Sequence, residues 1–212
     1  MKRIACLSQK GGVGKSSISR HLAASFAEAE WDTVLVDMDT RQNTSTGWAK
    51  RRQNHGFKPI DVVQAPTLNS AKVRPEADIA IIDGKPYSNA ETYELAKPCD
   101  LIIIPAASSL DDLEPQVVLA NDLTSRGINR DKILFVIYGF LTSGQTGGKE
   151  VEEVREYIGR HNYQVAKTAI GSRRSYITAL NNGLSLSEVD HPSSRRAGEQ
   201  LATEIYERIA KD

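Results

Sequence analysis

The chain has 212 residues, and its 27 Lys and Arg balance its 27 Asp and Glu, so the formal net charge is +0. A neutral chain has no overall attraction for nucleic acid or for an anionic membrane, so any such binding requires a local basic patch. The length suits one domain over residues 1–212. The N-terminal apolar run stops at Ser8, which is too short for a signal-peptide core. No apolar run approaches the roughly 18 residues of a membrane span.

Strand-like apolar runs alternate with helical patterns along the chain. The expected strands cover residues 3–8, 33–37, 60–64, 78–83, 100–105 and 132–138, with a weaker one at 165–170. The expected helices cover residues 16–30, 110–125, 149–160, 173–182 and 194–211, and a glycine-containing segment at 142–150 predicts a mobile loop. This alternation predicts a doubly wound α/β fold, in which helices flank a mainly parallel sheet.

The cysteines and histidines form no pattern typical of a disulfide framework or a metal site. Cys6 and Cys99 are far apart, and each lies beside an expected strand. This placement favours reduced thiols in the core of a cytoplasmic protein. The four histidines show no metal-ligand spacing.

The segment SQKGGVGKSS, residues 8–17, joins the first expected strand to the first expected helix. The ordinary phosphate-loop pattern G-x-x-x-x-G-K-[ST] fails at its first glycine, which is Gln9 here, whereas K-G-G-x-G-K-[ST] fits fully. Glycines let such a loop turn tightly and aim its N–H groups at phosphate oxygens in front of a helix N-terminus. The residues expected to contact a nucleotide are Lys10, Gly11, Gly12, Val13, Gly14, Lys15, Ser16 and Ser17.

The two lysines of this segment are expected to have different tasks. Lys15 would neutralise the charge of the β- and γ-phosphates, and Ser16 would bind Mg²⁺. Lys10 lies on the incoming side of the loop, so its side chain should point away from the phosphates that Lys15 serves and towards another subunit. The alternative is a glycine-rich turn with solvated lysines.

KGGVGKS is similar to the deviant Walker A motif of the ParA/MinD family of ATPases. Because the short N-terminus leaves no room for a helix-turn-helix module, the chain most resembles small ParA-type partition ATPases without an N-terminal DNA-binding domain. The resemblance implies ATP as the nucleotide and a nucleotide-sandwich dimer, in which Lys10 touches the partner's phosphates and supports catalysis together with Lys15. Tyr138 stands near the position where relatives often place an asparagine beside adenine.

Two further segments resemble acidic motifs of the same family. TVLVDMDTRQN resembles the switch segment D-x-D-P-Q, although Thr40 and Arg41 precede the glutamine, and ADIAIIDGKP resembles a Walker B strand. The resemblance implies that Asp39 positions or deprotonates the attacking water, that Asp37 binds Mg²⁺ through water, and that Asp83 holds the Mg²⁺ water shell. The alternative for Asp37 and Asp39 is the capping of a turn or a helix.

Basic residues gather between residues 160 and 196. Six of them oppose two acids, Glu188 and Asp190, which gives a local charge of +4: Arg160, Lys167, Arg173, Arg174, Arg195 and Arg196. The family resemblance implies that Arg173 and Arg174 help dimers to hold DNA through its phosphates without reading bases. The alternative is a solvated basic face.

These observations predict a cytoplasmic, nucleoid-associated ATPase that segregates DNA. By the resemblance, a ParB-like or small adaptor protein selects a plasmid, chromosome region or protein cargo and stimulates slow hydrolysis. One alternative is a MinD-like membrane switch, but the final expected helix carries several acids where a membrane helix needs a basic, lipid-facing surface. Another alternative is a metabolic ligase or reductase component on the same fold.

Overall fold

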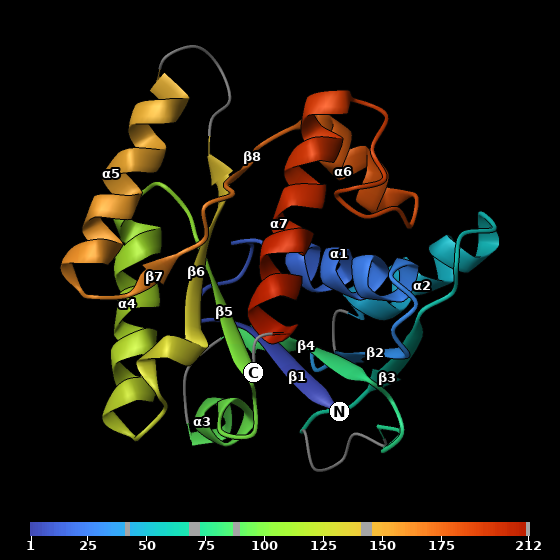
Figure 1. The fold of residues 1–212 in the computed structure, drawn as a ribbon, viewed down its shortest axis with the longest axis horizontal. Coiled ribbons are helices and arrows are strands. Elements are labelled where there is room, and N and C mark those ends of the chain that lie inside the picture. The colour runs from blue at the N-terminus through green and yellow to red at the C-terminus, as the bar shows by residue number, and fades with distance from the viewer. Residues whose placement is uncertain (41–42, 68–72, 87–89, 141–145, 211–212) are drawn as a thin grey trace.

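The computed structural model describes residues 1–40, 43–67, 73–86, 90–140 and 146–210 (Figure 1). The strands are β1 (Lys2–Ser8), β2 (Thr33–Asp37), β3 (Asp61–Gln64), β4 (Ile79–Pro86), β5 (Leu101–Ala106), β6 (Ile133–Phe140), β7 (Gln164–Val165) and β8 (Ile170–Gly171). The helices are α1 (Lys15–Glu28), α2 (Thr44–Asn54), α3 (Ala90–Ala96), α4 (Leu110–Ser125), α5 (Thr146–Arg160), α6 (Arg174–Asn181) and α7 (Pro192–Ala210), with a short 3-10 helix at Arg130–Lys132.

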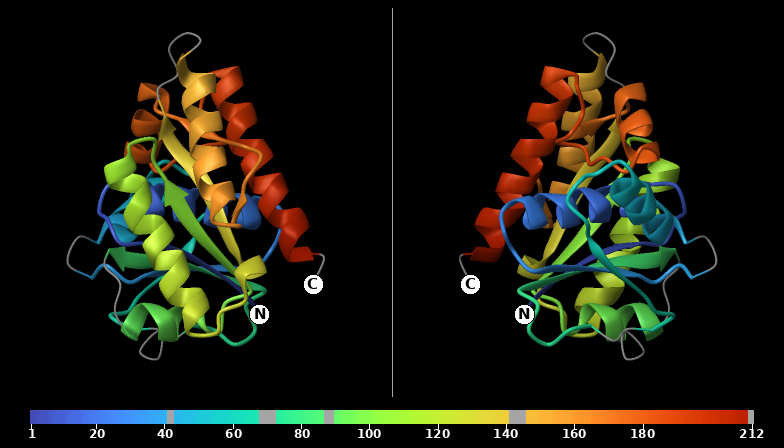
Figure 2. Two further views of the ribbon diagram at one scale, coloured as in Figure 1. Left: turned by 90° about the vertical axis from the view of Figure 1, so that its left-hand side faces the viewer. Right: turned by 90° about the vertical axis from the view of Figure 1, so that its right-hand side faces the viewer.

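The strands form one parallel sheet in the order β3-β2-β4-β1-β5-β6-β7, and β8 pairs with the end of β6. The chain therefore winds outward from the central β1 in both directions. Figure 2 shows the helices covering the sheet, with α4 and α5 nearest in one view and α1, α2 and α7 in the other. The predicted doubly wound α/β fold is confirmed.

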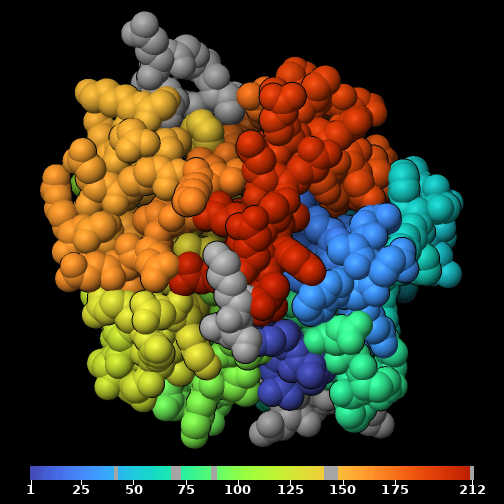
Figure 3. All heavy atoms as spheres, in the orientation of Figure 1, coloured from blue at the N-terminus to red at the C-terminus, as the bar shows by residue number. Residues whose placement is uncertain are grey.

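Each central strand contributes alternate residues to two separate cores. On β1, Ile4 and Cys6 face the core shared with α1, α6 and α7, while Ala5 and Leu7 face the core shared with α3, α4 and α5. Figure 3 shows α7 (red) lying against α1 (blue) on the first of these sides. Because both faces are buried, the strands read as continuous apolar runs. Cys6 and Cys99 are buried free thiols, as predicted.

Three helices and one strand differ from the sequence prediction. The polar helix α2 and the short helix α3 were not expected, and α5 begins at Thr146, within the expected loop 142–150. Residues 142–145 of that loop lie outside the described residues. In place of one strand at 165–170 there are the two-residue strands β7 and β8. Between them, side chains take several of the backbone hydrogen bonds: Arg155 donates to the carbonyls of Ala166 and Lys167, and Glu204 accepts from the N–H groups of Lys167 and Thr168.

The carboxyl ends of the central strands meet at one edge of the sheet. Asp37 at the end of β2 lies in register with Asp83 on β4, and Asp83 lies in register with Cys6 on β1, just before the loop to α1. In an open parallel sheet, ligands bind at this edge, where the winding reverses its direction. Within the described ranges, no helix has the length and apolar character needed to cross a membrane.

Candidate functional site

The loop between β1 and α1 is held in shape by its own hydrogen bonds. Ser8 Oγ accepts a bond from the Lys10 N–H (2.9 Å) and donates one to the Lys10 carbonyl (2.7 Å). Gly14 has φ of 106° at the start of α1, and a Cβ there would overlap the ring of Tyr138. Only glycine combines that backbone with that close approach.

Lys15 turns inward across this loop. Its side chain is almost fully buried, and Nζ donates a 3.0 Å hydrogen bond to the carbonyl of Lys10. Burial lowers the pKa of Lys15, and the nearby carboxylate of Asp83 opposes that shift. The ammonium therefore lies inside the loop, next to the Lys10 carbonyl. A phosphate chain bound there would meet both the charge of Lys15 and the loop N–H groups.

Lys10 turns outward instead. Its Nζ lies 2.9 Å from Oδ1 of Asp112 in the first turn of α4, and the two side chains are 39% and 37% exposed. The hydrogen bond from Lys10 is the main reason that the pKa of Asp112 lies below its ordinary value. The structure thus directs the two lysines to different places. Sequence reasoning missed Asp112, which lies 102 residues from Lys10 along the chain.

Ser16 and Asp83 come together at the floor of the site. Ser16 Oγ donates to Asp83 Oδ1 over 3.1 Å, and the Asp83 carboxyl is buried. Burial raises the pKa of Asp83, while hydrogen bonds from Ser45 and Ser16 oppose the rise. A hydroxyl beside a carboxylate suits Mg²⁺, which takes oxygen ligands and usually shares them with phosphates and water. The described residues contain no cluster of three or more His, Cys, Asp or Glu that could hold a metal unaided.

Asp37 receives the N-terminus of α2. Its Oδ2 accepts hydrogen bonds from the N–H groups of Ser45 (3.1 Å) and Thr46 (3.0 Å) and from Thr46 Oγ1 (3.2 Å), and its Oδ1 accepts one from the Asp39 N–H (3.3 Å). This is the capping arrangement that the sequence left open as an alternative. A water-mediated contact between Asp37 and Mg²⁺ stays a prediction.

Asp39 follows on the chain and is half-buried, and its carbonyl accepts a 2.9 Å bond from the Asn43 N–H. The displaced glutamine of this segment, Gln42, and Arg41 lie outside the described residues. The role of Asp39 towards water also stays a prediction.

Two polar residues complete the floor of the site, and sequence reasoning missed both. Ser45 Oγ donates a 2.6 Å hydrogen bond to Asp83 Oδ2 and accepts one from Arg20 Nε over 3.2 Å. Arg20 is buried on α1, one turn after Ser16, so the two share a helix face. That spacing was the only signal for Arg20 in the sequence, and Ser45 gave none because α2 was not expected. Together they fix Asp83 from the side opposite Ser16.

A cavity of about 590 Å³ opens beside the phosphate loop. It begins at Gly11, Gly12 and Ser17, passes Tyr138 at the end of β6, and continues to Arg173 and the inner face of α6. Burial raises the pKa of the Tyr138 phenol, and the neighbouring Ser17 opposes that rise. The size is that of an ordinary small-molecule site.

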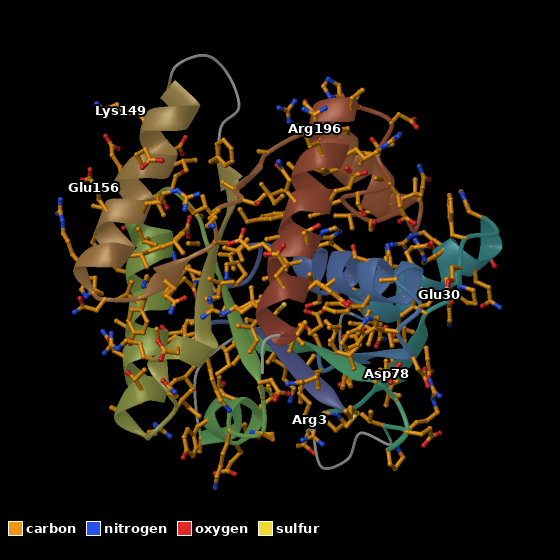
Figure 4. The ribbon with its side chains drawn as sticks, viewed as in Figure 1. Arg3, Glu30, Asp78, Lys149, Glu156 and Arg196 are labelled. Atoms are coloured by element: carbon orange, nitrogen blue, oxygen red, sulfur yellow. The ribbon has the colours of Figure 1, made fainter. Side chains whose placement is uncertain are left out.

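The six basic residues do not share one face. Arg174, Arg195 and Arg196 are exposed around the N-termini of α6 and α7, and none of them forms an ion pair within the described part of the chain. Arg160 instead pairs with Glu156 (3.5 Å) on α5. Figure 4 shows Glu156 at the left of the view, on α5, and Arg196 near the top centre, on α7. Arg173 is partly buried and lines the cavity.

A doubly wound sheet whose central strand leads through a two-lysine glycine loop into a helix defines a P-loop nucleotide-binding protein of the deviant Walker A type. The chain belongs to the CobQ/CobB/MinD/ParA nucleotide binding domain family, which matches residues 4–186. This confirms the resemblance found in the sequence.

Known relatives agree with this assignment. The chain is 30% identical to the chromosome partitioning protein ParA of Myxococcus xanthus over 77% of this chain and 74% of that protein. It is 25% identical to the sporulation initiation inhibitor protein Soj of Bacillus subtilis, over 100% and 97% of the two chains. A putative plasmid partition protein from Borrelia burgdorferi, solved with AMPPNP bound, has the same fold with a TM-score of 0.73 and 15% identity, over 98% and 99% of the chains.

Proposed function

We propose that the protein is a ParA-type ATPase that forms ATP-dependent sandwich dimers, binds DNA nonspecifically and positions a cargo through stimulated hydrolysis. The observation that carries this proposal is the separation of the two lysines. Lys15 lies inside the phosphate loop, whereas Lys10 is directed out of it to Asp112. Lys15 already supplies the loop with a cation. Lys10, on the rim, is therefore available to contact the nucleotide of a second protomer.

ATP and Mg²⁺ are the proposed ligands of the site. The loop N–H groups and Lys15 hold the phosphates, and Ser16 and Asp83 take the metal and its water shell. When bound, Mg²⁺ offsets the negative charge of the phosphates. The AMPPNP bound to the Borrelia protein supports a nucleoside triphosphate at this site.

Hydrolysis is proposed to need residues from both protomers. Asp39 orients the attacking water or accepts its proton, at a segment held in place by the bond between its N–H and Asp37. Lys10 of each protomer places its charge beside the γ-phosphate of the other, where negative charge develops. Turnover is therefore slow in the monomer and coupled to assembly.

DNA binding is proposed to use the exposed arginines around α6 and α7. Arg174 is the first residue of α6, Arg195 and Arg196 lie near the start of α7, and all three are exposed. Arg174 is one of the two residues predicted from the sequence. Arginine binds phosphate without reading bases. The partition roles in the names of the Myxococcus and Borrelia proteins support a DNA cargo, with a ParB-like or small adaptor to select it and stimulate hydrolysis. We place the active protein on the nucleoid.

A retention assay with nonspecific duplex DNA tests this function. With ATP present, a dimer that contacts about six phosphates should lose affinity with a log-log salt slope of about −5. ATPase rates should rise when DNA and the adaptor are present. Anionic vesicles serve as the control, because retention on vesicles and not on DNA would favour a MinD-like membrane switch. A salt-independent response, or no DNA retention with ATP, contradicts the proposal.

A further inference from the structure

Arg173 and Arg174 are neighbours in the sequence but differ in their surroundings. Arg173 has extended backbone angles (φ −135°, ψ 136°) immediately before α6, whereas Arg174 is its first helical residue. The change of backbone conformation sends the two side chains in different directions. Arg173 is partly buried and lines the cavity beside the phosphate loop, while Arg174 is exposed and does not line it.

The cavity has two chemically different ends. One end is lined by Gly11, Gly12, Val13 and Ser17 of the phosphate loop, whose backbone N–H groups attract phosphates. The other end is the inner face of α6, formed by Tyr176, Leu180 and Asn181. Because the phosphates of a nucleotide occupy the loop end, its sugar and base extend towards α6.

Arg173 stands at the second end beside an ordered tyrosine. The hydroxyl of Tyr176 donates a 2.7 Å hydrogen bond to the carbonyl of Ser194, which fixes the ring. The charge of Arg173 is close enough to oppose the rise that burial causes in the pKa of Tyr176. A planar guanidinium stacks on flat rings and donates hydrogen bonds in its own plane, and both properties suit a ribose or a base.

From this geometry we propose that Arg173 binds the nucleoside half of the bound nucleotide and is not a DNA contact. The inference deepens the proposed function and rests on its nucleotide site. It assigns the two arginines to different ligands. Arg173 binds the nucleotide, whereas Arg174, on the exposed face of α6, contacts DNA. Nucleotide binding at Arg173 then fixes the start of the helix that carries Arg174.

The test is calorimetric titration of the full chain, without DNA, with Mg-ADP and separately with Mg-pyrophosphate. Arg173→Ala should raise the dissociation constant for ADP by at least about fivefold, through the lost contact. Its affinity for pyrophosphate should stay within about twofold of the original protein, because pyrophosphate lacks the nucleoside. Arg174→Ala is the matched control, since it removes the same charge from the neighbouring position, and should bind both ligands within about twofold of the original protein.

Arg173→Lys keeps the charge but loses the planar fork, so it guards against misfolding of the alanine variant. It should weaken ADP binding by more than about twofold while its circular dichroism is unchanged. The proposal is overturned if the folded variants at this position bind ADP as tightly as the original protein, or if pyrophosphate affinity falls as much as ADP affinity. Failure of the original protein to retain DNA would remove the partition function and leave this test intact.

Discussion

The ion pair between Lys10 and Asp112 should oppose dimerisation. In the proposed dimer Lys10 must leave Asp112 to reach the partner's phosphates, so Asp112→Asn should favour the dimer. The pair is 2.9 Å long with both side chains more than one-third exposed, and exposed pairs contribute about 0.2–1 kcal/mol each. A dimer breaks two of them, which amounts to about 0.4–2 kcal/mol, or about a 2- to 30-fold lower dimer dissociation constant.

Sedimentation velocity with Mg-AMPPNP measures that constant without turnover. Asp111→Asn is the matched control. Asp111 is exposed in the same first turn of α4, so its substitution removes the same charge from the same helix end. General effects of charge and of the helix dipole are thereby equal in the two variants. If Asp112→Asn dimerises no more tightly than Asp111→Asn, the reasoning that Lys10 must be released is refuted.

Three further variants test the other assignments. Lys10→Ala should still bind ADP but lose ATP-dependent dimers and turnover, and unchanged light scattering and rate with ATP would remove its role across the dimer. Asp39→Ala should keep ATP binding and dimers while hydrolysis falls at least about tenfold, or about 1.4 kcal/mol, so a normal phosphate-release rate would contradict its assignment to water. Glu188→Gln should lower the free energy of unfolding in urea by about 2–3 kcal/mol, because two 2.8 Å bonds to the buried Arg52 are weakened. Burial raises the pKa of Glu188, yet the hydrogen bonds and charge of Arg52 hold it below its ordinary value of 4.5. The stabilisation is therefore present above about pH 4.5 and lost as the pH falls through the lowered pKa, and an equal difference between the proteins at pH 7 and at acid pH would contradict this account.

Elements with strong local signals were predicted closely. The strand at 33–37 and the helix at 110–125 match β2 and α4 at both ends. β2 is a five-residue apolar run that is buried throughout. α4 begins where the hydroxyl of Ser109 accepts a bond from the N–H of Asp112, an N-cap signal that the local sequence carries.

Helix α2 shows why other elements were missed. It has few apolar residues, so it lacks the periodic pattern that reveals a helix packed on a sheet. Its start depends on Asp37 from β2, and its buried Arg52 pairs with Glu188, which lies 136 residues further along the chain. The side chains that stabilise this helix come from elsewhere in the fold, and a local reading of the sequence does not include them.

The sequence alone determined the order of the strands along the chain and the phosphate loop with its two lysines. Each of those features depends on residues within its own short stretch of chain, where the spacing of apolar residues or glycines determines the backbone conformation. Only the tertiary structure decided that Lys10 pairs with a residue 102 positions away, that Asp37 caps α2, and that Arg173 lines the cavity while Arg174 stays exposed. The physical reason is that the sheet order brings distant segments to one edge, and each charged group then pairs with whichever partner that edge supplies.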